Sequence, residues 1–268
     1  GASSAGGTSL VGQRIGVAAA GGDLLLNGAI GEGDIKINGQ DVGAIADNAD
    51  MEAILKAIND NVDNVTATGF NTVVAKNAGS GVTAAGNLVI EVLEHGQSAT
   101  TTFTISASSN MAELVANINN EAGGVVNAEI NSDGKLTLSN NTGATISVLD
   151  SSASASSYDG GSGFFVTEKV FGGFIKLTAD DANPVRIERG NTHAVAEGLD
   201  ADLAALGFRE NTSETDDDAY TLTGIALTDT TTAWGQSDIK INGVEIYDAD
   251  IATTSFQGKL DAINNFSE

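Results

Sequence analysis

The chain has 268 residues, with 12 basic and 36 acidic side chains, a net charge of −24 at pH 7 and no cysteine. Nucleic acids and anionic membrane surfaces attract basic proteins, so this balance excludes nucleic-acid binding and attachment to an anionic membrane as functions. Without cysteine, the chain can form no disulfide, thiolate metal site or cysteine nucleophile.

No run of about 20 apolar residues is present, so the sequence predicts no membrane-spanning helix. Residues Gly1–Gly7 have neither an initiator methionine nor the basic and apolar segments of a signal peptide. At the other end, a helical pattern over Ser255–Glu268 stops without a glycine cap. We therefore expect the chain to be an internal region of a longer protein.

Hydrophobic residues make up 41% of the chain and charged residues only 18%, with 33 glycines. This composition is typical of β-rich, turn-rich proteins, because the polar surface must consist largely of Ser, Thr, Asn and Gly. The length favours two domains, each large enough to bury its own core.

The segment Asp-Ile-Lys-Ile-Asn-Gly occurs twice, at residues 34–39 and 238–243. Its alternation predicts a β-strand, and Asn-Gly predicts a tight turn, since both residues tolerate positive φ. The apolar spacing predicts an amphipathic helix after each copy, and a third between them with Asn110 as its N-cap. The helices end alike, in Ala57-Ile58-Asn59, Ala116-Asn117-Ile118-Asn119 and Ala262-Ile263-Asn264.

Strands are predicted around these helices, at residues 65–76, 88–93 and 101–105. Two further segments, Gly134–Val148 and Gly173–Ile187, have apolar residues at the same four offsets from their first glycine, and we interpret them as the same closing hairpin. The apolar face of each helix needs such a hairpin to pack against. The prediction pairs the helix over 51–58 with Ile175, Leu177, Val185 and Ile187, and the helix over 111–118 with Leu136, Leu138, Ile146 and Val148.

The closing hairpin follows directly in the middle unit, but the first unit does not reach one until Gly173. We infer an α+β fold of β-rich modules, each with one amphipathic helix packed on hairpins, in two domains with one inserted in the other. Residues 1–78 and 158–268 form the base domain, and residues 79–157 form the inserted outer domain. The exposed loop tip at residues 77–81 can accept such an insertion. Ser-rich 151–157 and Gly-rich 160–163 are predicted linkers, and Glu210–Asp218 is a second exposed break.

The Asp-Ile-Lys-Ile-Asn-Gly strand, with the Ala-Ile-Asn helix and the strand from Val65, resembles the IN motif of bacterial flagellins and their hook-associated relatives. Leu203–Phe208 is similar to an Ala-Ala-Leu-Gly-Leu ending in those proteins. The resemblance covers about residues 34–76, 171–208 and 238–265. The middle unit matches in its pattern of apolar and polar residues more than in residue identity. Two near-identical copies make the motif fairly specific for the flagellar family.

This resemblance implies a structural subunit of the bacterial flagellar filament whose central, β-rich domains are displayed outside the cell. Its partners would be other flagellin subunits, through terminal helical regions absent from this chain, after export without a cleavable signal peptide. Glycans on Ser/Thr stretches such as Ser151–Ser157 and Thr228–Thr232 are a further expectation. The alternatives are a hook-associated junction or filament-cap protein, and a glycan-binding surface adhesin module.

Motifs for catalysis and metal binding are missing. His95 and His193 do not belong to a His-Glu-x-x-His zinc motif, and Asp216–Asp218 lack the spacing of a calcium loop. The glycines at 31–33 and 160–163 fit neither a dinucleotide fingerprint nor a nucleophile elbow. The sequence thus predicts no enzyme, catalytic residue, cofactor or metal ligand. Trp234, Phe164, Phe165 and Phe171 are predicted core or domain-junction residues, with a binding patch as the alternative.

Overall fold

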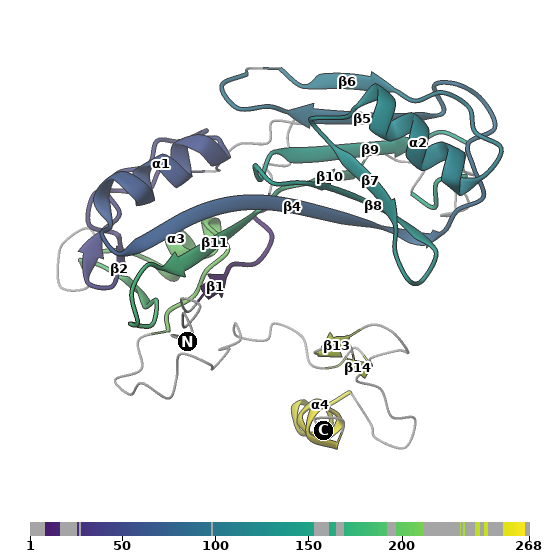
Figure 1. Ribbon diagram of the computed structural model, residues 1–268. Coiled ribbons are helices and arrows are strands. Elements are labelled where there is room, and N and C mark those ends of the chain that lie inside the picture. Colours follow the sequence, from purple (N-terminus) through teal and green to yellow (C-terminus); the bar gives the residue numbers. More distant parts are fainter. Residues whose placement is uncertain are drawn as a thin grey trace, which may run out of the picture. The chain divides into compact units, whose positions relative to one another are not determined.

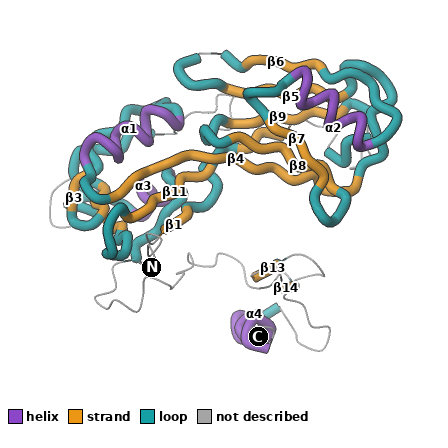
Figure 2. Tube along the Cα trace, viewed as in Figure 1, coloured by secondary structure: helices purple, strands orange, loops and turns teal. Residues whose placement is uncertain are grey.

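The computed structural model of the chain describes residues 9–16, 26, 28–97, 99–152, 161–164, 169–191, 197–211, 231, 233, 239–241, 244–245 and 254–265. The chain divides into two compact units, Gly1–Thr223 and Gly224–Glu268. Several antiparallel sheets and a few short helices make up the described part (Figures 1 and 2). The expected α+β fold of β-rich modules is confirmed.

The longest element of the compact unit Gly1–Thr223 is β4 (Val65–Ala78), a strand of 14 residues. It is the central strand of a five-stranded antiparallel sheet with the order β1-β11-β4-β8-β7. Val65 to Phe70 pair with β11 (Phe174–Ala179), and the pairing with β8 (Lys135–Asn140) starts at Asn71. The outer strands are β1 (Ser9–Val11) and β7 (Asn127–Ile130). Figure 1 shows β4 reaching from the α1 side of this unit to the α2 side.

A first hydrophobic core lies around the first half of β4. Helix α1 (Met51–Asn61) packs on β4 and buries Met51, Ile54 and Ile58. A three-stranded sheet, β12-β2-β3, and the short helix α3 (Asp200–Ala205) complete this part, with β2 at Ile35–Ile37, β3 at Gln40–Asp41 and β12 at Ile187–Arg189. Asn38 and Gly39 connect β2 to β3 with φ values of 48° and 76°, which confirms the turn that the Asn-Gly pair predicts.

A second core lies around the second half of β4. Helix α2 (Met111–Glu121) packs on β7 and buries Leu114 and Ile118. The four-stranded sheet β10-β9-β5-β6 completes the core, with β5 at Leu88–Leu93, β6 at Thr101–Thr104, β9 at Thr145–Asp150 and β10 at Lys169–Phe171. Val73 and Ala75 of β4 belong to this core, as does Phe164.

The segments Gly134–Val148 and Gly173–Ile187 are equivalent, but they are not hairpins. β8 and β9 lie in different sheets, and so do β11 and β12. The alternating pattern fits both arrangements, because each strand needs one apolar side whether its neighbour lies beside it or across a core. The apolar residues themselves lie where the sequence places them: Ile175, Leu177, Val185 and Ile187 share the first core with α1, and Leu136, Leu138, Ile146 and Val148 share the second core with α2.

Part of the predicted linker is packed against the protein. Within residues 161–164, Ser162 is fully buried, and both its backbone N–H and its hydroxyl donate to the Asp150 carboxylate. Ser80 and Gly81 donate their backbone N–H groups to the carbonyl oxygen of Gly161 at 2.8 and 3.0 Å. The two chain segments that border the predicted insertion are therefore joined to each other. The domain division itself, 1–78 with 158–268 and 79–157, stays a prediction.

The compact unit Gly224–Glu268 repeats the order of elements with which the other two modules begin. β13 (Lys240–Ile241) pairs with β14 (Val244–Glu245), and α4 (Phe256–Asn265) follows. The pairs β2–β3 and β5–β6 precede α1 and α2 in the same way. Among the described residues of the whole chain, no helix has the length and apolar character needed to cross a membrane.

Candidate functional site

The helices of the three modules begin with the same kind of cap. The Asp50 carboxylate accepts from the backbone N–H of Ala53 (2.8 Å), and the Asn110 side chain accepts from that of Glu113 (2.9 Å), as predicted for Asn110. Ser255 Oγ does the same for α4 at 3.0 Å. Each such cap stabilises its helix by about 1 kcal/mol, because it satisfies a backbone donor that has no partner within the helix.

The Asn of the Ile-Asn pair joins each helix to the strand that follows it. In α1, Asn59 Nδ2 donates to the carbonyl oxygen of Ala67 (3.0 Å), while its Oδ1 accepts from the Ala67 N–H (2.8 Å). In α2, Asn119 makes the same two bonds to Ala128, at 2.9 and 2.8 Å. We call this paired contact the Asn clamp. The preceding Ile58 and Ile118 are fully buried in their cores.

Both Asn clamps act on a strand edge that, in the described part of the chain, has no neighbouring strand. Ala67 pairs with Leu177 of β11 on one side, and β8 joins the other side of β4 only from Asn71. Ala128 pairs with β8 on one side, and β7 is the last strand of its sheet. A carboxamide carries a donor and an acceptor, so it can replace the two hydrogen bonds of an absent strand.

The need for this replacement follows from burial. Ala67 and Ala128 are each only 3% exposed, and a buried backbone group without a partner costs about 1–3 kcal/mol. An Asp side chain at the position of Asn59 or Asn119 would lack the donor, and a Leu side chain would lack both the donor and the acceptor. The sequence shows the recurring Ile-Asn pair, but the role of the Asn was missed, because its partner lies in a separate element. The signal that could have revealed it is an Asn at a helix end a few residues before an alternating strand.

A polar network lies at the point of β4 where its pairing changes from β11 to β8. The Arg14 guanidinium donates to Asn71 Oδ1 (2.7 Å) and to the carbonyl oxygens of Gly172 and Thr72 (both 2.6 Å). It lies over the Phe174 ring, 4.6 Å from the centroid, and burial lowers its pKa. Guanidinium-over-ring contacts of this kind are favourable, and more so when water is excluded.

Asn71 completes this network from inside the protein. It is 1% exposed, and its Nδ2 donates to the carbonyl oxygens of Ala144 (3.0 Å) and Phe171 (2.9 Å). The predicted junction residue Phe171 packs against the second core, and Phe164 is buried there, as expected. Sequence analysis missed both Arg14 and Asn71, since neither belongs to a motif.

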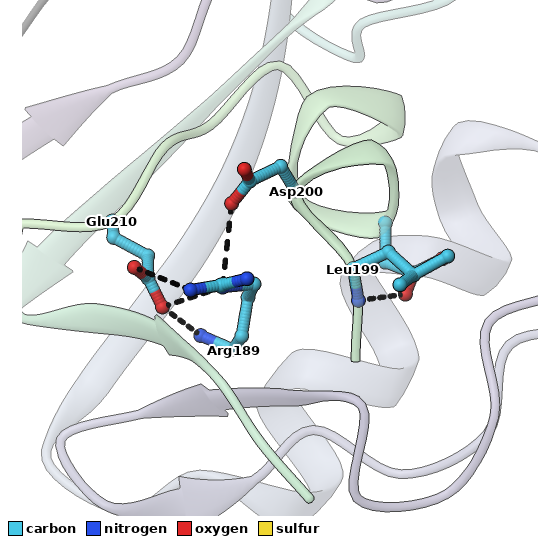
Figure 3. Close-up of polar contacts among 5 residues, drawn as sticks. Arg189, Leu199, Asp200 and Glu210 are labelled. Atoms are coloured by element: carbon cyan, nitrogen blue, oxygen red, sulfur yellow. Dashed lines mark hydrogen bonds and ion pairs between the residues drawn. The ribbon is translucent and has the colours of Figure 1, made fainter. Parts of the chain in front are cut away.

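A second charged contact holds the edge of the three-stranded sheet (Figure 3). Arg189 on β12 donates through Nε to Glu210 (3.0 Å), which also accepts from the Arg189 backbone N–H (2.9 Å), and Asp200 lies 3.3 Å from Nε. The hydrogen bond to Glu210 raises the pKa of Arg189. Partial burial raises the pKa of Glu210, but the hydrogen bonds and charge of Arg189 outweigh it and lower that pKa overall.

This contact corrects one expectation. Glu210 was predicted to start an exposed acidic break, yet it is bound to Arg189, and the next residue, Asn211, exchanges backbone and side-chain hydrogen bonds with Ile187 and Val185. A basic residue on a neighbouring strand attracts the carboxylate, which the acidic sequence pattern does not show. The rest of that break, residues 212–218, lies outside the described residues.

Three possible metal ligands meet beside α1. Asp50, Glu52 and His95 each place one ligand atom within 4.8 Å of the other two. His95 follows β5 in the second-core part, whereas the two carboxylates belong to the start of α1. Sequence analysis predicted no metal ligand, because these residues come together only in the folded chain. His193, Trp234, Phe165 and Asp216–Asp218 lie outside the described residues.

A hollow of about 810 Å³ opens next to His95, between the end of α2 and the β8–β9 connection. Its lining is rich in amide and hydroxyl groups, including Gln97, Asn127, Ser139 and Asn141. Among the described residues that line it, none is Trp, Tyr or Phe. The hollow therefore offers hydrogen bonds but no aromatic ring for stacking.

Comparison with known families finds a match within the middle unit. Residues 95–142 match the family model described as the flagellin hook IN motif. This segment is similar to a flagellin IN motif. The matched residues run from the end of β5 to Thr142 and include the Asn clamp between Asn119 and Ala128. The flagellin resemblance is thus confirmed, and the match lies in the unit that resembles the family by pattern more than by letters.

One solved structure with some likeness is the flagellar cap protein FliD D1-D2-D3 domains from Escherichia coli. The likeness covers 66% of this chain and 49% of that chain, at 15% identity and a TM-score of 0.20. This chain thus spans about half the length of that structure, and such a TM-score does not establish a shared fold. The search of curated proteins finds no match. The IN-motif match supports a structural protein of the flagellum.

Proposed function

We propose that the chain is the surface-displayed central region of a flagellin, a structural and non-enzymatic component of the bacterial flagellar filament. The observation that carries this proposal is the IN motif at residues 95–142, together with an Asn clamp of the same geometry between Asn59 and Ala67. Two units with one internal design suit a displayed region built by repetition.

The charge of the chain supports display on a crowded filament. A net charge of −24 makes neighbouring copies repel one another and keeps such a surface soluble. Contacts between subunits would be made by terminal helical regions outside this chain, since the described helices are at most 11 residues long. Localisation outside the cell and export without a cleavable signal peptide are part of the proposal.

Labelling of native flagella tests the assembly role. An antibody raised against this chain should stain filaments along their whole length in electron micrographs. Staining confined to the filament end or the hook junction would instead support the alternative, a filament-cap or hook-associated protein. Staining away from flagella would contradict both. The full-length gene should encode helical heptad segments on both sides of this region.

The hollow beside His95 favours a second candidate, a glycan-binding surface adhesin module. Amide and hydroxyl groups such as those of Gln97, Asn127 and Ser139 hydrogen-bond sugar hydroxyls, although stacking rings are missing from this lining. A glycan array probed with the folded chain tests this candidate. Binding that is lost in Asn127→Ala would support it, and a blank array would exclude it.

Attached glycans are a related but separate proposal. The Ser/Thr stretches at residues 151–157 and 228–232 offer hydroxyl groups to which sugars would be attached. Protein purified from native filaments should then exceed the polypeptide mass. An intact mass equal to that of the bare polypeptide would refute this proposal.

A further inference from the structure

Asp50, Glu52 and His95 form a cluster that neither the IN motif nor the cores explain. Their ligand atoms all lie within 4.8 Å of one another, and the side chains of Asp50 and His95 are partly buried. The cluster combines one imidazole with two carboxylates from parts of the chain that are distant in sequence.

Each of the three side chains keeps an acceptor position for a cation. Among the described residues, neither carboxylate forms an ion pair with Lys or Arg, and the His95 ring accepts or donates no hydrogen bond. Asp50 is already oriented, since its Oδ1 accepts from the N–H of Ala53 (2.8 Å) and its Oδ2 from that of Gly96 (3.1 Å). Each oxygen keeps another lone pair. Such fixed carboxylates are typical of metal-binding positions.

We propose that Asp50, Glu52 and His95 bind a divalent transition-metal ion of the Zn²⁺ type. A mixed imidazole and carboxylate set suits such ions, whereas Ca²⁺ and Mg²⁺ take oxygen ligands alone. Ligands held about 2.0–2.2 Å from one ion lie about 3–3.5 Å apart. The exposed Glu52 side chain can close the remaining distance by rotation, and water fills the open coordination positions.

The site connects the two hydrophobic cores of the compact unit Gly1–Thr223. Asp50 and Glu52 belong to the start of α1, which packs in the first core. His95 belongs to the connection that follows β5, a strand of the second core. An ion held by all three residues would cross-link these parts at a place where the Asp50–Gly96 hydrogen bond already joins them. This inference does not depend on the proposed flagellar function.

The test uses the fact that the chain has two histidines, so that its proton NMR spectrum contains two imidazole C2–H signals. Zn²⁺ added in equimolar steps should shift the His95 signal and leave the His193 signal in place. His193→Ala, the matched control, should bind as the parent chain does. His95→Ala should abolish the calorimetric binding signal. Asp50→Asn keeps a good helix cap, and it should weaken binding at least about tenfold because one charged ligand is lost.

Three results would overturn the proposal. One is an unchanged His95 signal at millimolar Zn²⁺, and another is an equal shift of both histidine signals, which indicates binding to any exposed imidazole. The third is undiminished binding by a folded His95→Ala chain. Zn²⁺ should also raise the thermal unfolding midpoint of the parent and His193→Ala chains, but not that of His95→Ala, because a ligand stabilises only the state that binds it.

Discussion

The first and middle units use one local design for two different positions in a sheet. Each has a capped helix, a buried Ile, and an Asn that binds the backbone of the next strand. In the first unit that strand is β4, a central strand that serves both cores. In the middle unit it is β7, four residues at the edge of the sheet. The Asn clamp is thus a local device, and the role of the strand is set by its other neighbours.

The difference lies in how many contacts support each clamped strand. β4 is held by β11 along its first half and by β8 along its second, so the Asn59 clamp covers only a short free edge. β7 has β8 on one side, and on the other it depends on Asn119 and the packing of α2. The same contact should therefore matter more for local opening in the middle unit than in the first.

The largest effect should come from removing the second core altogether. Phe70 and Phe174 are paired across β4 and β11, so an Asn-Gly turn that replaces residues 71–173 converts them into a short hairpin. We expect the first core to stay folded, with one cooperative thermal transition by circular dichroism. Deleting only residues 79–157 should also leave a folded base, but with a lower midpoint, because Val73, Ala75 and Phe164 lose their core. If either variant unfolded without a cooperative transition, the insertion prediction would be wrong.

Asn71→Leu should have the next largest effect, because it breaks the network between the cores. It removes the hydrogen bonds that Asn71 Nδ2 donates to the carbonyl oxygens of Ala144 and Phe171, and one contact of Arg14. The Ala144 oxygen keeps the hydrogen bond from Asn140 Nδ2 (2.8 Å). The free energy of unfolding should fall by about 2–4 kcal/mol, as measured by urea denaturation. Asn141→Leu on the surface turn nearby is the control and should change it by less than about 1 kcal/mol.

The two Asn clamps can be compared directly with Asn59→Leu and Asn119→Leu. Each variant should lose about 1–3 kcal/mol, since the backbone groups of a buried Ala lose their partners. Hydrogen exchange should rise across β7 in Asn119→Leu more than across β4 in Asn59→Leu. Asn120→Ala, an exposed neighbour, should leave exchange unchanged. Equal exchange in both strands would show that the Asn clamp is not what limits opening of β7.

The smallest effect concerns pH and the contact between Arg189 and Glu210. The pKa of Glu210 in the folded chain lies below its ordinary value of 4.5, so this contact stabilises the fold fully above that value. The stabilisation is lost as pH falls through the lowered pKa. Glu210→Gln should therefore lower the thermal unfolding midpoint at pH 7. Below pH 4.5, the midpoint of this variant should fall less with decreasing pH than that of the parent chain. Glu188→Gln on the same strand is the control, and it should change the unfolding midpoint at pH 7 less than Glu210→Gln does.

The sequence predicts the local features of this fold well. The helices at Met51–Asn61 and Met111–Glu121, the Asn38-Gly39 turn and the assignment of Ile175 and Leu138 to separate cores follow from periodicity and turn chemistry. Each depends on residues close together in the chain, where spacing alone decides which side chains share a face.

The contacts that determine how elements combine could not be predicted. Arg14 meets Asn71 and Phe174, and Asp50 meets His95, through folding rather than through spacing. The closing strands were expected to pair as hairpins, because alternation does not say whether the partner lies beside a strand or across a core. Several different partner strands satisfy the same alternating pattern, so the pattern does not determine which of them is used.

The sequence order of the two cores has a consequence for the route of folding. Every buried apolar residue of the second core falls between Val73 and Phe164, whereas the first core combines residues before Ala67 with residues after Ile175. Closing a loop of about 100 residues in an unfolded chain carries an entropic cost. Once the second core has formed, Asn71 Nδ2 lies 2.9 Å from the Phe171 carbonyl oxygen, so that β4 and β11 already start side by side. The middle unit should therefore fold first and act as the nucleus on which the strands of the first core are brought together.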